Sequence, residues 1–208
     1  MFCTRCGRPL EAGASACPSC GQPVAASEQP LTGPATPTPP LLLTTSPLEM
    51  VWDKLSLMTN FQFRDDAGRT LGVTHGEIAF PVKYTLQDDR GEVVLTLDAQ
   101  RVHGLLYDFM VHDAAGRVLA TIRQESSFLS RKYAVSIDGR PDYLLTTDAA
   151  GYHCAIHGAA DGSTVATAER KPALRTSTTR IEIAEGAPLD RRVILGAMIL
   201  VVYLTTRQ

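Results

Sequence analysis

Apolar and polar residues alternate in short runs along most of the chain, with polar turns between the runs. The run Tyr133-Ala134-Val135-Ser136-Ile137 is typical, and Asp138-Gly139 follows it. A period of two places successive side chains on opposite faces of a β-strand, and Asp-Gly is a strong hairpin signal. Turn glycines recur at a nearly constant spacing: Gly68, Gly91, Gly116, Gly139, Gly162 and Gly186. The pattern predicts a hairpin at each of these glycines, and therefore about twelve antiparallel strands.

The C-terminal pattern is different, because residues 193–204 carry no charge and no polar face. A helix that is apolar all round is either buried in protein or embedded in lipid. As a helix this stretch spans about 18 Å, whereas the hydrocarbon core of a bilayer is about 30 Å thick. A buried core helix is therefore favoured, with a membrane-inserted helix as the alternative. A closed barrel would enclose the helix and leave no sheet edge exposed.

Two short patterns suggest a family. They are the strand, basic connection and tyrosine strand over residues 118–135, and Asp190-Arg191-Arg192-Val193 at the start of the apolar helix. With the twelve-strand layout they make residues 48–208 resemble the Tubby C-terminal-like domains, which include the LURP-one-related proteins and the phospholipid scramblases. The resemblance implies a mainly β fold, a closed barrel around a buried C-terminal helix, and a ligand bound at the barrel surface. For the scramblases it also implies a link to calcium.

The first residues carry a different motif. Cys3-x2-Cys6 and Cys17-x2-Cys20 form two knuckles, and each is followed by glycine and then by proline after one residue. Two such knuckles supply four thiolates for a tetrahedral zinc ion, and a site closed by four cysteines is structural. Clustered cysteine pairs favour metal over disulfides. Residues 1–24 are accordingly predicted to be a zinc ribbon, resembling those at the N-termini of many bacterial proteins.

Residues 25–47 are rich in proline and threonine, which predicts a stiff, extended linker. The barrel domain is expected to cover residues 48–208. Residues 48–58 fit either a strand, as the family resemblance implies, or a helix, because Ser46-Pro47-Leu48-Glu49 has the spacing of a capping box. No signal peptide is visible at Met1, so we expect a cytoplasmic protein.

No catalytic constellation is evident, and the protein is predicted not to be an enzyme. The nearest candidate is Tyr152-His153-Cys154-Ala155-Ile156-His157, where a strand would place both histidines on one face and Cys154 on the other. We interpret Cys154 as a core residue. The aspartates at the turns raise the question of calcium, but their turn positions explain them and an EF-hand spacing is absent.

Cationic residues are the remaining candidates for a binding site. Tubby-like domains bind phosphoinositide head groups through basic side chains, so the resemblance suggests an anion-binding patch on this barrel. The residues proposed for it are Arg131, Lys132, Arg170, Lys171 and Arg175. The alternative is that these are ordinary solvated strand ends. A formal net charge of −2 argues against nucleic acid as a partner.

The function predicted from the sequence is that of a non-enzymatic adaptor. Its barrel would bind anionic phospholipid head groups, which would place the protein peripherally at the inner membrane surface. One alternative is a protein-interaction scaffold that uses the zinc ribbon or the linker to bind its partner. The other is a membrane-inserted protein similar to the scramblases.

Overall fold

The computed structural model describes residues 39–53, 60–77, 83–103, 106–125, 131–148, 150–171, 173 and 176–206. The side chains of residues 100–107 are not part of this description. The elements are α1 (Leu41–Thr44), β1 (Leu48–Asp53), β2 (Gln62–Arg64), β3 (Thr70–Glu77), β4 (Lys83–Asp88), β5 (Val93–His103), β6 (Leu106–His112), β7 (Val118–Glu125), β8 (Arg131–Ile137), β9 (Arg140–Thr147), β10 (His153–Gly158), β11 (Thr164–Lys171), β12 (Thr176–Ile183) and α2 (Arg191–Thr206).

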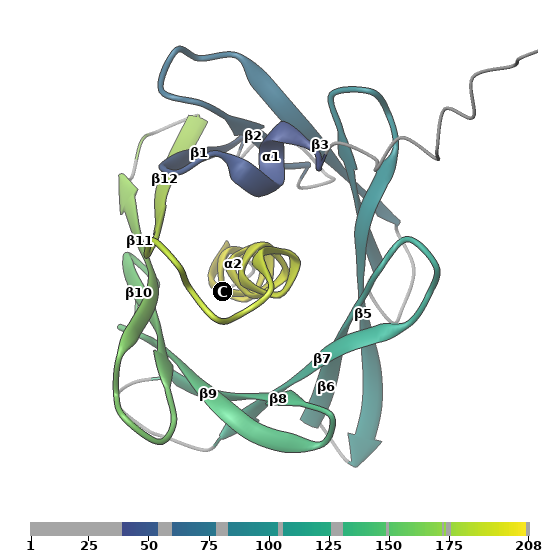
Figure 1. Ribbon diagram of the computed structural model, residues 1–208, viewed down its shortest axis with the longest axis vertical. Coiled ribbons are helices and arrows are strands. Elements are labelled where there is room, and N and C mark those ends of the chain that lie inside the picture. The colour runs from purple at the N-terminus through teal and green to yellow at the C-terminus, as the bar shows by residue number, and fades with distance from the viewer. Residues whose placement is uncertain are drawn as a thin grey trace, which may run out of the picture. The chain divides into compact units, whose positions relative to one another are not determined.

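The strands form one closed antiparallel barrel, as the sequence predicted. Each strand pairs with its neighbours in the chain, and β1 pairs with β12 to close the sheet. In that closing pair Leu48 lies opposite Ile181 and Trp52 lies opposite Ser177. Figure 1 looks along the barrel and shows α2 in its centre, surrounded by the strands.

Helix α2 is buried on all its sides along the middle of its length. Every residue from Val193 to Val202 is buried. The inward side chains of the strands, such as Val111, Val135 and Ile156, are also fully buried and join the same apolar core. Gly196 lets the helix approach β6, because a Cβ at this position would lie 2.9 Å from a methyl group of Val111. Within the described residues, no helix has the length and apolar character needed to cross a membrane.

Five of the six repeating glycines lie in hairpin turns, and all six have positive φ. The sixth was predicted wrongly as a hairpin: Gly186 lies in the connection from β12 to α2, and β1 supplies the remaining strand. Successive turns of an up-and-down barrel alternate between its ends. The turns after β2, β4, β6, β8 and β10 therefore share one end with the β12–α2 connection. We call this the entrance end, and the end where α2 finishes the exit end.

The end of the predicted linker packs onto the barrel. Leu42, in the single helical turn α1, is 1% exposed and belongs to the core. Ser46 Oγ accepts a hydrogen bond from the backbone N–H of Ile183 at 3.1 Å. The chain thus joins the barrel before residue 48, where the linker was expected to end, because the apolar Leu42 is enclosed by the strands. Residues 48–53 form a strand, as the family resemblance implied, and residues 54–58 lie outside the described residues.

Candidate functional site at the two ends of the barrel

Aspartates organise the turns of the entrance end. Asp113 Oδ1 accepts hydrogen bonds from the backbone N–H groups of Ala115 and Arg117, both at 2.9 Å. Its Oδ2 forms an ion pair with Arg117 at 2.7 Å. These hydrogen bonds hold the pKa of Asp113 below its usual value, against a smaller opposing effect of burial. Asp65 and Asp88 cap their own turns in the same way. Capping of the turns therefore explains why aspartate stands at these positions.

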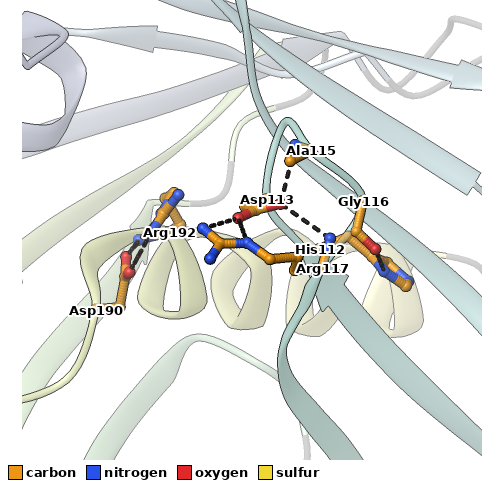
Figure 2. Close-up of polar contacts among 7 residues, drawn as sticks. All are labelled: His112, Asp113, Ala115, Gly116, Arg117, Asp190 and Arg192. Carbon is orange, nitrogen blue, oxygen red and sulfur yellow. Dashed lines mark hydrogen bonds and ion pairs between the residues drawn. The ribbon is translucent and has the colours of Figure 1, made fainter. Parts of the chain in front are cut away.

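A second ion pair lies where α2 begins. Figure 2 shows Arg192 bonded to Asp190 close to the Asp113–Arg117 pair. The distance from Arg192 Nη2 to Asp190 Oδ2 is 2.6 Å. Burial works to raise the pKa of Asp190, but the hydrogen bonds and charge of Arg192 lower it overall. At the entrance end, Arg117 and Arg192 are thus each paired with a nearby aspartate.

The exit end contains one arginine that has no carboxylate partner among the described residues. The guanidinium carbon of Arg170 lies 4.9 Å from the ring centroid of Trp52 and 5.9 Å from that of Tyr152. Its Nη1 donates a hydrogen bond to Thr205 Oγ1 at 3.3 Å, in the last turn of α2. Burial lowers the pKa of Arg170. The two aromatic faces and the negative end of the α2 dipole stabilise the charge of Arg170 against this effect of burial.

Arg131 makes a second contact with the end of α2. It lies on the same face of β8 as the buried Tyr133, and its Nη1 is 3.5 Å from the backbone oxygen of Leu204. Gly151, in the β9–β10 turn, completes this packing: its φ is +70°, and a Cβ there would collide with Thr205. Arg131 and Arg170, although distant in sequence, thus converge on the same helix end.

The cations predicted as one patch are divided by strand alternation. Arg131 and Arg170 turn toward α2, whereas Lys132 and Lys171 are exposed on the outer surface. Lys132 lies on β8 and Lys171 on β11, three strand spacings apart, or about 14 Å. Arg175 lies outside the described residues. The four described cations therefore share the exit end but do not form a contiguous patch.

The outer surface of β9–β12 has a groove of about 570 Å³ that includes Thr146, Thr167 and Glu169. Arg180 also lines it, but Arg180 pairs with Glu182 at 3.1 Å and with Asp66 at 3.0 Å. These carboxylates raise the pKa of Arg180. Since its charge is already paired, Arg180 does not add a free cation to the exit end.

Cys154 is a core residue, as the sequence analysis proposed. It is 9% exposed, and its Sγ contacts Met198 Sδ at 3.5 Å. Burial, with a contribution from Asp148, raises the pKa of the Cys154 thiol to about 12. A thiol with such a pKa is not ionised at neutral pH and is a poor nucleophile. Among the described residues, no three histidine, cysteine or acidic side chains are grouped as metal ligands.

Sequence reasoning missed the aromatic partners of Arg170. Trp52 and Tyr152 come from different strand ends, and Trp52 continues into a row of rings formed by Phe61, Tyr84 and Tyr203. Only the closed register of β11, β12 and β1 brings Trp52 and Arg170 together. No local pattern in the sequence signals this contact.

Family models match both predicted parts of the chain, the barrel and the zinc ribbon. The model of the LURP-one-related family matches residues 50–202. The chain belongs to the LURP-one-related family. A zinc-ribbon model matches residues 2–24, which contain the predicted ligands Cys3, Cys6, Cys17 and Cys20. These four cysteines lie outside the described residues.

A similar solved structure is the X-ray structure of a protein from Arabidopsis thaliana. It is 20% identical, the match covers 78% of this chain and 92% of that chain, and the TM-score is 0.49. A search among curated proteins gave no match.

Proposed function

We propose that this LURP-one-related protein is a non-enzymatic adaptor that binds anionic phospholipid head groups with the exit end of its barrel. The membrane contact would be peripheral, at the inner surface. Lys132 and Lys171 would contact the phosphates, and Arg175 in the adjoining segment would add to them. Arg131 and Arg170, which the sequence analysis placed in the anion-binding patch, would instead hold the end of α2.

The observation that carries the proposal is the pair of exposed lysines at the exit end. Lys132 and Lys171 are exposed, and neither forms an ion pair with another described residue. At the entrance end Arg69, Arg117 and Arg192 are each paired with an aspartate. An anionic surface attracts unpaired lysines by about 1 kcal/mol each. Tyr152, 40% exposed beside Arg170, suits an interface because its ring is amphipathic.

The experiment is co-sedimentation of the full, zinc-loaded chain with vesicles of phosphatidylcholine alone or with added phosphatidylserine or phosphoinositide. We expect binding only to the anionic vesicles, and weaker binding as salt increases. The double variant K132Q/K171Q should bind about tenfold to thirtyfold more weakly, from two lysines at about 1 kcal/mol each.

The matched control is R90Q/R140Q, which removes the same charge from the entrance end. Arg90 and Arg140 are exposed and form no ion pair with another described residue. We expect this variant to bind like the unmodified protein. Equal binding to neutral vesicles, or an equal loss in both double variants, would contradict the proposed orientation.

We further propose that the ribbon binds one structural zinc ion through Cys3, Cys6, Cys17 and Cys20. The donor set fits zinc, since four thiolates close a tetrahedral site and leave no position for a reacting water. A ribbon of this size has too few residues for an apolar core, so the metal would supply its folding energy and make it a module for binding a protein partner. Metal analysis of the purified chain should find about one zinc per chain, and C3S/C6S should lose it.

A further inference from the structure

The entrance end has an open groove of about 690 Å³ beside the start of α2. Its walls are the β8–β9 turn, the β10–β11 turn and the connection that leads from β12 into α2. Its apolar surface is partly exposed and is formed by Val118, Leu119, Ile137, Tyr143, Pro188 and Leu189. Val118 is 52% exposed, although it is a large apolar residue at the start of a strand. The volume is within the range of about 300–1,000 Å³ typical of binding pockets.

The polar residues around this apolar surface are mostly acidic. Asp138 and Asp142 line the groove, and their carboxylates have no hydrogen-bond or ion-pair partner among the described residues. Asp161 also lines it, and its Oδ1 accepts hydrogen bonds from the N–H and Oγ of Ser163 at 3.0 and 2.9 Å. Asp161 therefore remains ionised, with its pKa lowered by these bonds. Arg140 is the one cationic side chain among the lining residues.

The fold fixes these carboxylates in place. Asp138 has φ of +49° and Gly139 has φ of +79°, which makes them the two central residues of a tight hairpin turn. The backbone oxygen of Asp142, in β9, accepts a hydrogen bond from the N–H of Ala159 at 2.9 Å, which ties the β10–β11 turn to this strand. The groove is therefore a preformed surface, and binding would require little ordering of the protein.

We propose that this groove binds a peptide segment of a protein partner that has an apolar side chain next to lysine or arginine. The apolar side chain would cover Val118, Ile137 and Tyr143. Its basic neighbours would lie against Asp138 and Asp142. Charge complementarity selects this occupant, because an acidic segment or an anionic lipid would be repelled by the same carboxylates. The groove thus serves protein recognition at the end of the barrel opposite the proposed lipid surface.

The test measures fluorescence anisotropy of a labelled synthetic peptide, Gly-Lys-Leu-Leu-Arg-Gly, with the full chain. Two control peptides replace either the basic residues with glutamate or both leucines with serine. We expect saturable binding of the first peptide, with a Kd tighter than about 1 mM, and at least about tenfold weaker binding of each control. The affinity should fall as salt is raised.

Two pairs of variants locate the binding site. D138N/D142N should weaken binding by about threefold to thirtyfold, because it removes two exposed charge pairs. D89N/E185Q removes the same charge from exposed positions outside the groove and should have no effect. Val118→Ser should weaken binding, whereas Val93→Ser should not, since Val93 is a partly exposed valine in the corresponding position after the β4–β5 turn.

Three results would overturn the proposal. The first is the absence of saturable binding of the basic peptide, and the second is equal loss in both acidic double variants. The third is a concentration-dependent dimer in sedimentation velocity that Val118→Ser abolishes, because a second copy of the chain would then be the occupant. Loss of vesicle binding in K132Q/K171Q, with peptide binding retained, would leave this inference intact and separate it from the lipid proposal.

Discussion

The two ends of the barrel are built by different means. At the entrance end each hairpin carries its own aspartate and glycine, and Asp113 satisfies N–H groups only two and four residues away. At the exit end the contacts of the two inward arginines join distant segments: Arg170 with Trp52, Arg170 with Thr205, and Arg131 with Leu204. The hairpin turns of the entrance end are therefore specified locally, whereas these arginine contacts form only when the barrel closes around α2.

More of the unsatisfied buried polar groups lie toward the exit end. Among the described residues, Trp52 Nε1, Arg170 Nε, Ser177 Oγ and Thr179 Oγ1 are buried without a hydrogen-bond partner, on the inner wall formed by β1, β12 and β11. Arg64 Nε and Asp88 Oδ2, at the ends of β2 and β4, are the corresponding atoms toward the entrance end. Buried donors without partners lower stability. The exit end thus accepts an energetic cost, which we interpret as the consequence of placing a cation beside the helix end.

The largest expected effect comes from the helix that both ends share. Leu200→Asp would place a carboxylate in a position that is fully buried, and we expect a loss of more than about 5 kcal/mol and no folded barrel. Leu200→Ala should lose about 2–5 kcal/mol but fold. Urea unfolding followed by circular dichroism distinguishes the two. A folded, stable Leu200→Asp variant would mean that α2 is not enclosed.

A smaller effect is expected from Arg170 at the exit end. Arg170→Ala removes the stacking on Trp52 and the bond to Thr205, and it should lower the free energy of unfolding by about 2 kcal/mol. Arg170→Met retains most of the packing without the buried charge, so its loss should be smaller. Urea unfolding of both variants tests this order. If both variants lose equally, the charge rather than the packing is what holds the helix end.

The stability that the entrance end contributes should depend on pH. Because the pKa of Asp113 is lowered in the folded state, its contribution is present above the unfolded pKa, near 3.9, and is lost as pH falls through the lower folded value. The stability difference between the unmodified protein and Asp113→Asn should therefore shrink below about pH 4. Thermal melts between neutral and acid pH measure it. Asp89→Asn, at an exposed turn position, is the control and should differ little from the parent at any pH.

The smallest effect on stability is expected for the exposed lysines of the exit end. K132Q/K171Q should change the free energy of unfolding by no more than about 0.5 kcal/mol, because both side chains are exposed and neither is paired with another described residue. A thermal melt checks this. A larger loss would mean that the lysines stabilise the fold. Weaker vesicle binding by this variant could then result from its lower stability.

The fold was predictable because its signals are local. Alternation with aspartate and glycine at the turns indicated the strands, and the uncharged run at residues 193–204 indicated a helix that must be enclosed. The prediction of a hairpin at Gly186 was wrong because a turn glycine does not reveal whether a strand or a helix follows it. The cationic site was not predictable in detail. Arg131 and Lys132 are adjacent in sequence, yet the strand sends one toward α2 and the other outward, and only the register of distant strands reveals what each one contacts.

The most direct test of this account is hydrogen exchange of the α2 backbone amides. If the closed barrel encloses the helix, the amides from Leu195 to Val202 should exchange only through global unfolding. Their free energy of opening should then equal that of inward-facing strand residues such as Val135 and Ile156. Exchange of these α2 amides at a clearly lower free energy than the strands would show that the helix leaves the barrel independently, and would contradict the account.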